Sequence, residues 1–269
     1  MVNVFVDAFK LERDGRFIDT RFDLQNVDLG KRLFEEEHVK GAIYWDLEHD
    51  LSDMSKRDGR HPLPNKVQLQ TLFEKSGLHY NDAIYIYDQG GAPYATRAWW
   101  MLKYAGFQHV YIVNGGYESL VAAGFEITKE VTKYEPRALQ LQWNDAILLN
   151  REDVLAITEG KHKATLLDAR AAARFRGEFE PFEPIAGHIP TAKNYDWEQL
   201  KDGNKLVITS SILDTVSKDE EIIVYCGSGV TATPVYCILA EAGYQNIKIY
   251  MAGYSDWVYH YPVEVGAIN

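Results

Sequence analysis

The strongest constraint on the fold of this 269-residue chain is that the chain repeats itself. Five segments of the first half match five segments of the second half in the same order. The matched pairs are 18–21 with 167–170, 38–42 with 188–192, 84–88 with 222–226, 105–107 with 242–244, and 114–117 with 251–254. Ordered matches at this long spacing predict a duplicated unit of about half the chain, which is a whole domain rather than a short solenoid repeat.

Each half alternates short apolar runs with helical patterns. The runs are 83–87, 110–113, 222–225 and 247–250, and helical patterns such as 96–104 and 233–242 lie between them. Near-continuous apolar strands that alternate with helices are typical of a parallel sheet covered on both faces. We therefore predict an α/β fold with two tandem domains, each a mostly parallel sheet flanked by helices on both faces. The predicted domains are 1–128 and 144–269, joined by a polar linker at 129–143 that contains Pro136.

The charge and composition exclude several classes of protein. A net charge of −11 argues against a nucleic-acid partner, which needs a basic face, and means that an anionic substrate needs a local positive pocket. No apolar run reaches membrane-spanning length, and the first residues do not form a signal peptide, so no membrane partner is expected. Two cysteines do not make a disulfide framework. These features favour a cytoplasmic, reducing location.

Cys226 is the main candidate for chemistry. It follows the apolar run 222–225 directly, and a helix is predicted to begin at about Thr231 and to end near Gly243. Ligands of parallel α/β sheets bind beyond the carboxyl ends of the strands, where Cys226 lies. A thiol among backbone amides at a helix N-terminus is held in its reactive thiolate form. The position therefore indicates covalent chemistry at sulfur, although an inert buried thiol fits the same local pattern.

The residues after Cys226 suit such a loop. Gly227 and Gly229 let the backbone curl around sulfur, and the amides from Gly227 through Val230 to Thr231 can donate to a sulfur anion. Ser228 and Thr231 also offer hydroxyl donors. The other cysteine, Cys237, lies among apolar residues of the predicted helix and is interpreted as a core residue.

The chain resembles two-domain rhodanese-type sulfurtransferases over nearly its full length. The resemblance rests on the paired Asp-x-Arg and His-x-x-x-Ala segments, on 97–101, and on the loop 226–232. This loop is similar to the active loop of 3-mercaptopyruvate sulfurtransferases and is shared by some bacterial relatives named for thiosulfate. The resemblance implies a catalytic second domain that carries sulfur as a persulfide on Cys226. It also implies a non-catalytic first domain, in which Asp88 stands where a cysteine would otherwise be.

The resemblance also implies substrate-binding residues. Arg174 stands where the family places a substrate-binding arginine, and Arg176 is a second candidate. Mercaptopyruvate enzymes usually carry another arginine at the position that Glu183 occupies here. Glu48 and His61 lie in segments that resemble a family region near the nucleophile, so they are candidates for proton handling and substrate orientation.

Four other residues of the repeated motifs are expected to be structural. In the family the arginines tie a strand end to neighbouring backbone, and the histidines stabilise turns. They are Arg21, Arg170, His38 and His188.

The donor can be argued in two ways. Neutral Gly227 and Ser228 beside the cysteine favour a monoanionic donor, 3-mercaptopyruvate, whereas Glu183 in place of an arginine favours thiosulfate. We expect 3-mercaptopyruvate to be the donor, with thiosulfate as the alternative. Expected acceptors are a thiol, either thioredoxin or a small thiol, or cyanide. A non-catalytic binding module is a further alternative. A dual-specificity phosphatase is excluded because Ala232 replaces the arginine that phosphate requires. No metal-ligand spacing or phosphate-binding loop is present, so no metal or cofactor is expected.

Overall fold

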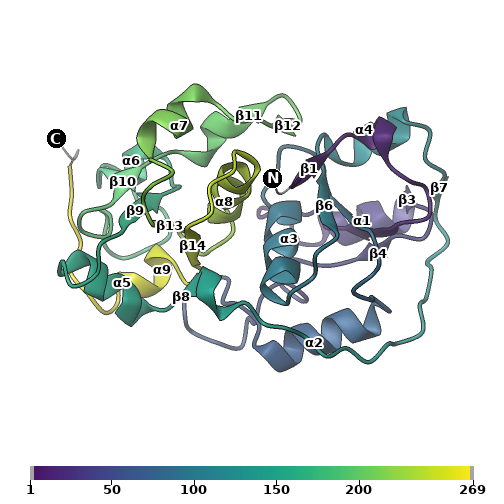
Figure 1. Cartoon of the computed structure of the whole chain (residues 1–269), viewed down its shortest axis with the longest axis horizontal. Coiled ribbons are helices and arrows are strands. Elements are labelled where there is room, and N and C mark those ends of the chain that lie inside the picture. The colour runs from purple at the N-terminus through teal and green to yellow at the C-terminus, as the bar shows by residue number, and fades with distance from the viewer. Residues whose placement is uncertain (1–2, 267–269) are drawn as a thin grey trace. The chain divides into compact units, whose positions relative to one another are not determined.

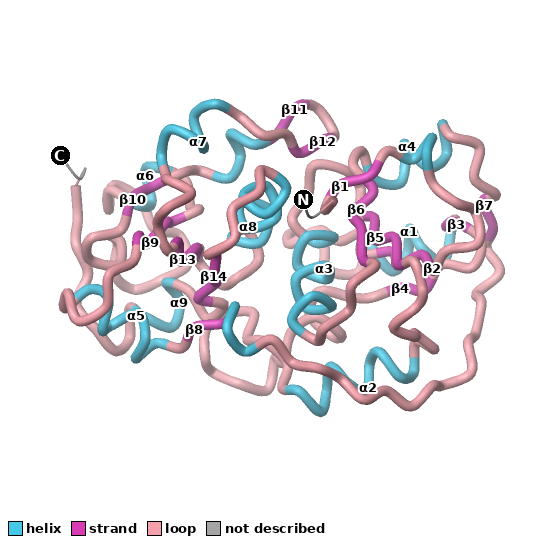
Figure 2. The backbone as a smooth tube through the Cα atoms, viewed as in Figure 1, coloured by secondary structure: helices cyan, strands magenta, loops and turns pink. Residues whose placement is uncertain are grey.

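The computed structural model describes residues 3–266, and its contacts divide the chain into two compact units (Figures 1 and 2). Unit 1 consists of 3–53, 64–144 and 202–206, and unit 2 of 54–63, 145–201 and 207–266. The segments 54–63 and 202–206 therefore pack with the unit that the other half of the chain mainly forms. The linear boundaries at 128 and 144 stay a prediction.

Unit 1 is built on a five-stranded parallel sheet. In spatial order its strands are β1 (Phe5–Val6), β6 (Val110–Val113), β5 (Ile84–Tyr87), β2 (Arg16–Asp19) and β4 (Ile43–Tyr44). Its helices are η1 (Ala8–Lys10), α1 (Leu29–Glu36), α2 (Lys66–Lys75), α3 (Tyr94–Tyr104) and α4 (Gly116–Ala122). A separate antiparallel pair joins β3 (His38–Val39) to β7 (Ile127–Thr128).

Unit 2 repeats this sheet. Its parallel strands, in spatial order, are β10 (Lys193–Asn194), β9 (Thr165–Asp168), β13 (Ile222–Tyr225), β14 (Ile247–Tyr250) and β8 (Leu148–Leu149). Its α-helices are α5 (Arg151–Thr158), α6 (Ala172–Phe175), α7 (Ser210–Thr215), α8 (Ala232–Glu241) and α9 (Tyr254–Trp257). The 3₁₀ helices η2 (Asp145–Ile147) and η3 (Trp197–Leu200) and the short strands β11 (Lys201–Asp202) and β12 (Lys205–Leu206) complete the elements of the second half.

The two sheets confirm the predicted α/β fold and the duplication. Read from opposite ends, the strand orders are the same, so that β2 corresponds to β9, β5 to β13 and β6 to β14. The central strands β5 and β13 are buried at every position, as expected for strands that are covered on both faces. Helices α2 and α5 are capped by Asn65 and Asn150, which directly precede them and form capping boxes with the residue three positions later.

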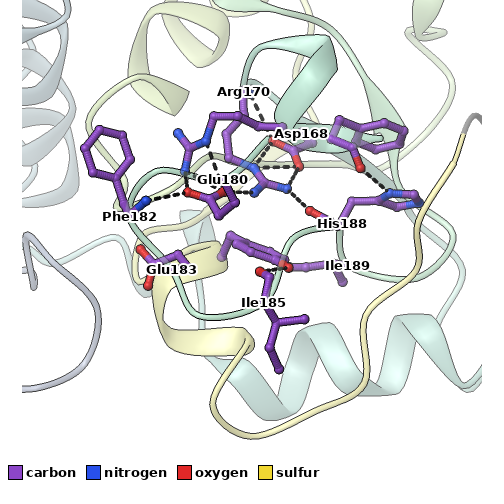
Figure 3. A network of polar contacts seen from close by, with 12 residues as sticks. Asp168, Arg170, Glu180, Phe182, Glu183, Ile185, His188 and Ile189 are labelled. Atoms are coloured by element: carbon purple, nitrogen blue, oxygen red, sulfur yellow. Dashed lines mark hydrogen bonds and ion pairs between the residues drawn. The ribbon is translucent and has the colours of Figure 1, made fainter. Parts of the chain in front are cut away.

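The repeated Asp-x-Arg and histidine motifs stabilise the fold, as predicted. In unit 2, Arg170 Nη2 lies 2.6 Å from Asp168 Oδ2 and donates to the carbonyl of Gly187 at 2.7 Å (Figure 3). His188 stacks on Phe175, with the ring centroids 3.8 Å apart. The equivalent contacts in unit 1 are Arg21 with Asp19 and with the carbonyl of Glu37, and His38 stacked on Phe34.

Candidate active site

Cys226 lies at the carboxyl end of β13 and is 1% exposed. The short helix α9 holds the loop that follows, because the amides of Tyr254 and Ser255 donate to the carbonyls of Cys226 and Gly227, both at 2.8 Å. Within the part of the chain that the structure describes, four loop amides donate to no protein acceptor: those of Gly227, Gly229, Val230 and Thr231. The loop therefore uses two of its carbonyls for structure and leaves these four amides without an acceptor among the described residues.

Two glycines allow this loop to exist. Gly229 has a φ of +71°, and a Cβ atom there would lie 2.1 Å from the carbonyl oxygen of Met251. Gly253, directly before α9, has a φ of +66°, and its Cβ atom would lie 2.5 Å from the carbonyl oxygen of Cys226. Both positions combine a left-handed backbone with close backbone packing, so only glycine fits.

Helix α8 begins where the sequence predicts. Thr231 is its N-cap residue and forms no side-chain capping bond, while Ala242 ends the helix one residue before Gly243. The carbonyl of Val230 accepts a 2.8 Å hydrogen bond from Thr233 Oγ1. The ten-residue helix therefore starts directly at the loop and directs its N-terminal end toward it.

The segment 54–63 brings His61 to the loop. His61 is buried, and its Nδ1 lies 2.9 Å from Ser228 Oγ. The backbone amide of Arg60 donates to Ser255 Oγ at 3.1 Å, which fixes this segment against α9. His61 therefore contacts the loop of Cys226, although its role in proton handling stays a prediction.

Arg60 is a site residue that the sequence reasoning missed. A Cβ atom on Gly227 would lie 2.6 Å from Arg60 Nη2 and 3.5 Å from Arg174 Nη2, so both guanidinium groups face the residue next to Cys226. Arg174 was predicted to bind the donor, and the structure places it at the loop. The available signal for Arg60 was its position directly before His61.

Acidic side chains hold both arginines. Arg60 Nη1 forms an ion pair with Glu183, while Arg174 makes two-pronged contacts of 2.8–3.0 Å with Glu180. Glu180 also receives a 3.2 Å contact from Arg170 Nη1. Figure 3 shows Glu180 in this network, with Phe182 and Glu183 on the same loop. Burial lowers the pKa of Arg60 and raises that of Glu183, in each case against the attraction of the partner.

The remaining predicted residues lie in different surroundings. The side chain of Arg176 is 39% exposed and pairs with Glu178 at 2.7 Å. Glu48 belongs to unit 1, where its amide donates to Asp46 Oδ1 at 2.8 Å. Their roles at the substrate stay predictions. Cys237 is fully buried in α8, and burial raises its pKa well above the ordinary value, which agrees with its interpretation as a core residue.

Asp88 occupies in unit 1 the position equivalent to Cys226. Its carboxylate accepts hydrogen bonds from the amides of Gly90 at 2.8 Å and Ala95 at 3.1 Å. Burial raises its pKa to about 6 against these hydrogen bonds. The first loop thus holds the negative charge of its own side chain, at the place where the second loop holds the thiol.

The raised pKa of Asp88 makes stability depend on pH. The folded-state pKa of about 6 exceeds the ordinary 3.8, so the folded protein takes up a proton between these values. Protonated Asp88 therefore adds to the free energy of unfolding. This stabilisation is fully present below the unfolded-state pKa and is lost as the pH rises through about 6. Lowering the pH from 7 to 5 should therefore raise the free energy of unfolding of the wild type by about 1 kcal/mol relative to Asp88→Asn. Urea unfolding of both proteins measures this, and equal pH dependence would contradict it.

Other kinds of site are not found in the described part of the chain. Among residues 3–266, no three histidine, cysteine, aspartate or glutamate side chains gather so as to hold a metal ion. Over the same residues, no helix combines the length and the apolar character needed to cross a bilayer.

Comparisons with known proteins agree with this geometry. A relative from Pseudomonas aeruginosa, named a probable 3-mercaptopyruvate sulfurtransferase, is 35% identical over 92% of this chain and 90% of its own length. The 3-mercaptopyruvate sulfurtransferase of Escherichia coli is 32% identical over 82% of this chain and 80% of its own. A relative from Mycobacterium tuberculosis, named a putative thiosulfate sulfurtransferase, is also 32% identical. The match spans 89% of this chain and 86% of that protein.

Solved structures show the same architecture. The crystal structure of the E. coli 3-mercaptopyruvate enzyme superposes with a TM-score of 0.80 at 29% identity, covering 94% of this chain and 99% of that one. The Leishmania major 3-mercaptopyruvate sulfurtransferase gives 0.82 at 26% identity, covering 95% and 74%. The family model of the rhodanese-like domain matches twice, at residues 7–123 and 151–260. With both halves matched and the two sheets equivalent, the chain belongs to the rhodanese-like family.

Proposed function

We propose that the protein is a sulfurtransferase that moves sulfur from a small anionic donor to an acceptor through a persulfide on Cys226. One observation carries the proposal: Cys226 lies at the end of β13, directly before the amides of Gly227, Gly229, Val230 and Thr231, which are unpaired within residues 3–266, and the guanidinium groups of Arg60 and Arg174 face Gly227. Amide donors and a helix N-terminus stabilise negative charge on sulfur, and the arginines supply the local positive charge that a net charge of −11 does not.

The favoured donor is 3-mercaptopyruvate. The Cys226 thiolate attacks the donor sulfur, the S–S bond forms, and the carbon–sulfur bond breaks. The electron pair of that bond leaves with the pyruvate enolate, which takes up a proton to give pyruvate. An acceptor thiolate or cyanide then attacks the outer sulfur of the persulfide and restores the Cys226 thiolate. In this proposal the amides of Gly227, Gly229, Val230 and Thr231 stabilise the charge on sulfur in both steps.

The charge balance at the loop supports this donor. Arg60 and Arg174 are each paired with a carboxylate, Glu183 and Glu180, so much of their positive charge is already compensated within the chain. A monoanionic carboxylate needs less compensation than the thiosulfate dianion, which is the second candidate and would leave sulfite after attack on its outer sulfur. The donors named for the relatives include both compounds.

The test is direct loading of the cysteine. Mass spectrometry after incubation with each donor should show one added sulfur, and parallel kcat/KM measurements should favour 3-mercaptopyruvate. A clear preference for thiosulfate would replace the donor. Absence of sulfur uptake from either compound would favour a non-catalytic binding module. We also propose that the acceptor is thioredoxin, a small thiol or cyanide. A cytoplasmic location is a further part of the proposal.

Arg174→Ala should raise KM for the donor by roughly 10- to 100-fold, because a charge-assisted two-pronged contact is worth about 1.5–3 kcal/mol. The turnover number kcat should change much less, because Arg174 is proposed to bind the anionic end of the donor and not to act on the reacting sulfur atoms. Glu180 keeps its contact with Arg170 in this variant, so the loop that carries Glu180 should keep its conformation. Lys161→Ala, which removes an exposed cation paired with Glu159, is the control. An unchanged KM in the Arg174 variant would remove this residue from the donor site.

A further inference from the structure

The partner of Arg60 is a carboxylate of the chain itself. The Glu183 side chain is only 3% exposed, whereas Arg60 is 31% exposed, so the carboxylate binds Arg60 from the interior and leaves part of the guanidinium open. A buried carboxylate keeps its charge only when a cation or donors compensate it, and here the cation is Arg60. The Arg60 guanidinium therefore links Glu183 to the loop that follows Cys226.

The loop that carries Glu183 covers both arginines. The ring of Phe182 lies 4.5 Å from the Arg60 guanidinium carbon and 5.1 Å from that of Arg174, and its own amide donates to Glu180 at 3.1 Å. Glu180, Phe182 and Glu183 thus meet the two cations with two negative charges and one aromatic ring. An anion that approaches Arg60 meets the field of a carboxylate already bound there.

We propose that Glu183 is a specificity-determining residue that lowers the affinity of the site for doubly charged donors more than for singly charged ones, by occupying Arg60. The inference rests on the proposed sulfur transfer and adds a reason for donor choice. The argument follows from Coulomb's law: repulsion by Glu183 scales with the charge of the donor, so a dianion loses about twice the interaction energy that a monoanion loses. Glu183 acts through Arg60 and is not placed at the reacting sulfur.

The test is Glu183→Gln, which removes the charge but keeps the shape and an oxygen for Arg60. We expect kcat/KM to rise about tenfold for thiosulfate and about threefold for 3-mercaptopyruvate, since the two gains in free energy stand in a ratio of about two. The gain should appear in KM, with kcat nearly unchanged. Glu183→Met, which removes the charge at similar volume, should shift the donor ratio in the same direction even if the amide variant folds poorly.

Two measurements keep the interpretation clear. Glu198→Gln makes the same charge change at an exposed residue of unit 2 that pairs with Lys201, and it should leave the donor ratio unchanged. Mass spectrometry of the wild type shows whether a persulfide forms at all, so failure of the proposed function would be seen there first. If the wild type loads sulfur but both Glu183 variants keep its donor ratio, the role assigned to Glu183 is overturned.

Discussion

Cys226→Ser is expected to fold like the wild type and to lose sulfur transfer by at least about 10³-fold. A serine hydroxyl is not ionised by amide donors at neutral pH, and an oxygen in place of sulfur cannot carry the transferred atom as a persulfide. The change is nearly isosteric at a position that is 1% exposed. The substitution should therefore remove the chemistry and cost little stability.

The measurement is the mass of the protein after incubation with donor, together with the turnover number. Cys237→Ala provides the matched control, because this second cysteine is fully buried in α8 and is expected not to react with the donor. The control should still gain one sulfur. Sulfur uptake by the Cys226 variant, or its loss in the Cys237 variant only, would show that the nucleophile has been assigned to the wrong residue.

Gly229→Ala is expected to lower the rate of sulfur loading by about 100-fold and to destabilise the fold by roughly 2–4 kcal/mol. The new Cβ atom would lie 2.1 Å from the carbonyl oxygen of Met251, so the loop or the end of β14 must move. Any such movement changes the direction of the loop amides that follow Cys226. Both the reaction and the stability should suffer, because one backbone approach serves both.

Gly160→Ala separates the two causes of this effect. Gly160 has the same φ of +71°, but a Cβ atom there would meet nothing within 4 Å. It should cost only about 1 kcal/mol of left-handed strain and leave sulfur loading intact. Urea unfolding and the loading rate of the two variants give the comparison. Equal behaviour of the two alanine variants would mean that close packing on Met251 does not shape the loop.

Local pattern was sufficient to predict the elements that build the sheets. The runs 222–225 and 247–250 are the strands β13 and β14, and α8 begins one residue after the predicted Thr231. These elements are set by short-range apolar periodicity and by glycine positions, which a single sequence displays. The duplication, read from ordered matches, reappears as the same strand order in both sheets.

The surroundings of Cys226 could be predicted only in part. Arg60 lies 166 positions before Cys226 in the sequence, and no local pattern shows that the segment 54–63 packs with the second half. From the sequence, Glu183 is notable only because it stands where relatives usually carry an arginine. The structure shows that it pairs with the distant Arg60. Charge pairs between remote segments depend on tertiary packing, which cannot be predicted from local sequence patterns.

The packing of segment 54–63 with unit 2 has a consequence for any attempt to express the second repeat alone. A gene that encoded the second repeat alone would supply the nucleophile but neither Arg60 nor His61, which the first repeat contributes. A fragment cut at the midpoint of the chain should therefore lack two side chains that face or contact the loop of Cys226.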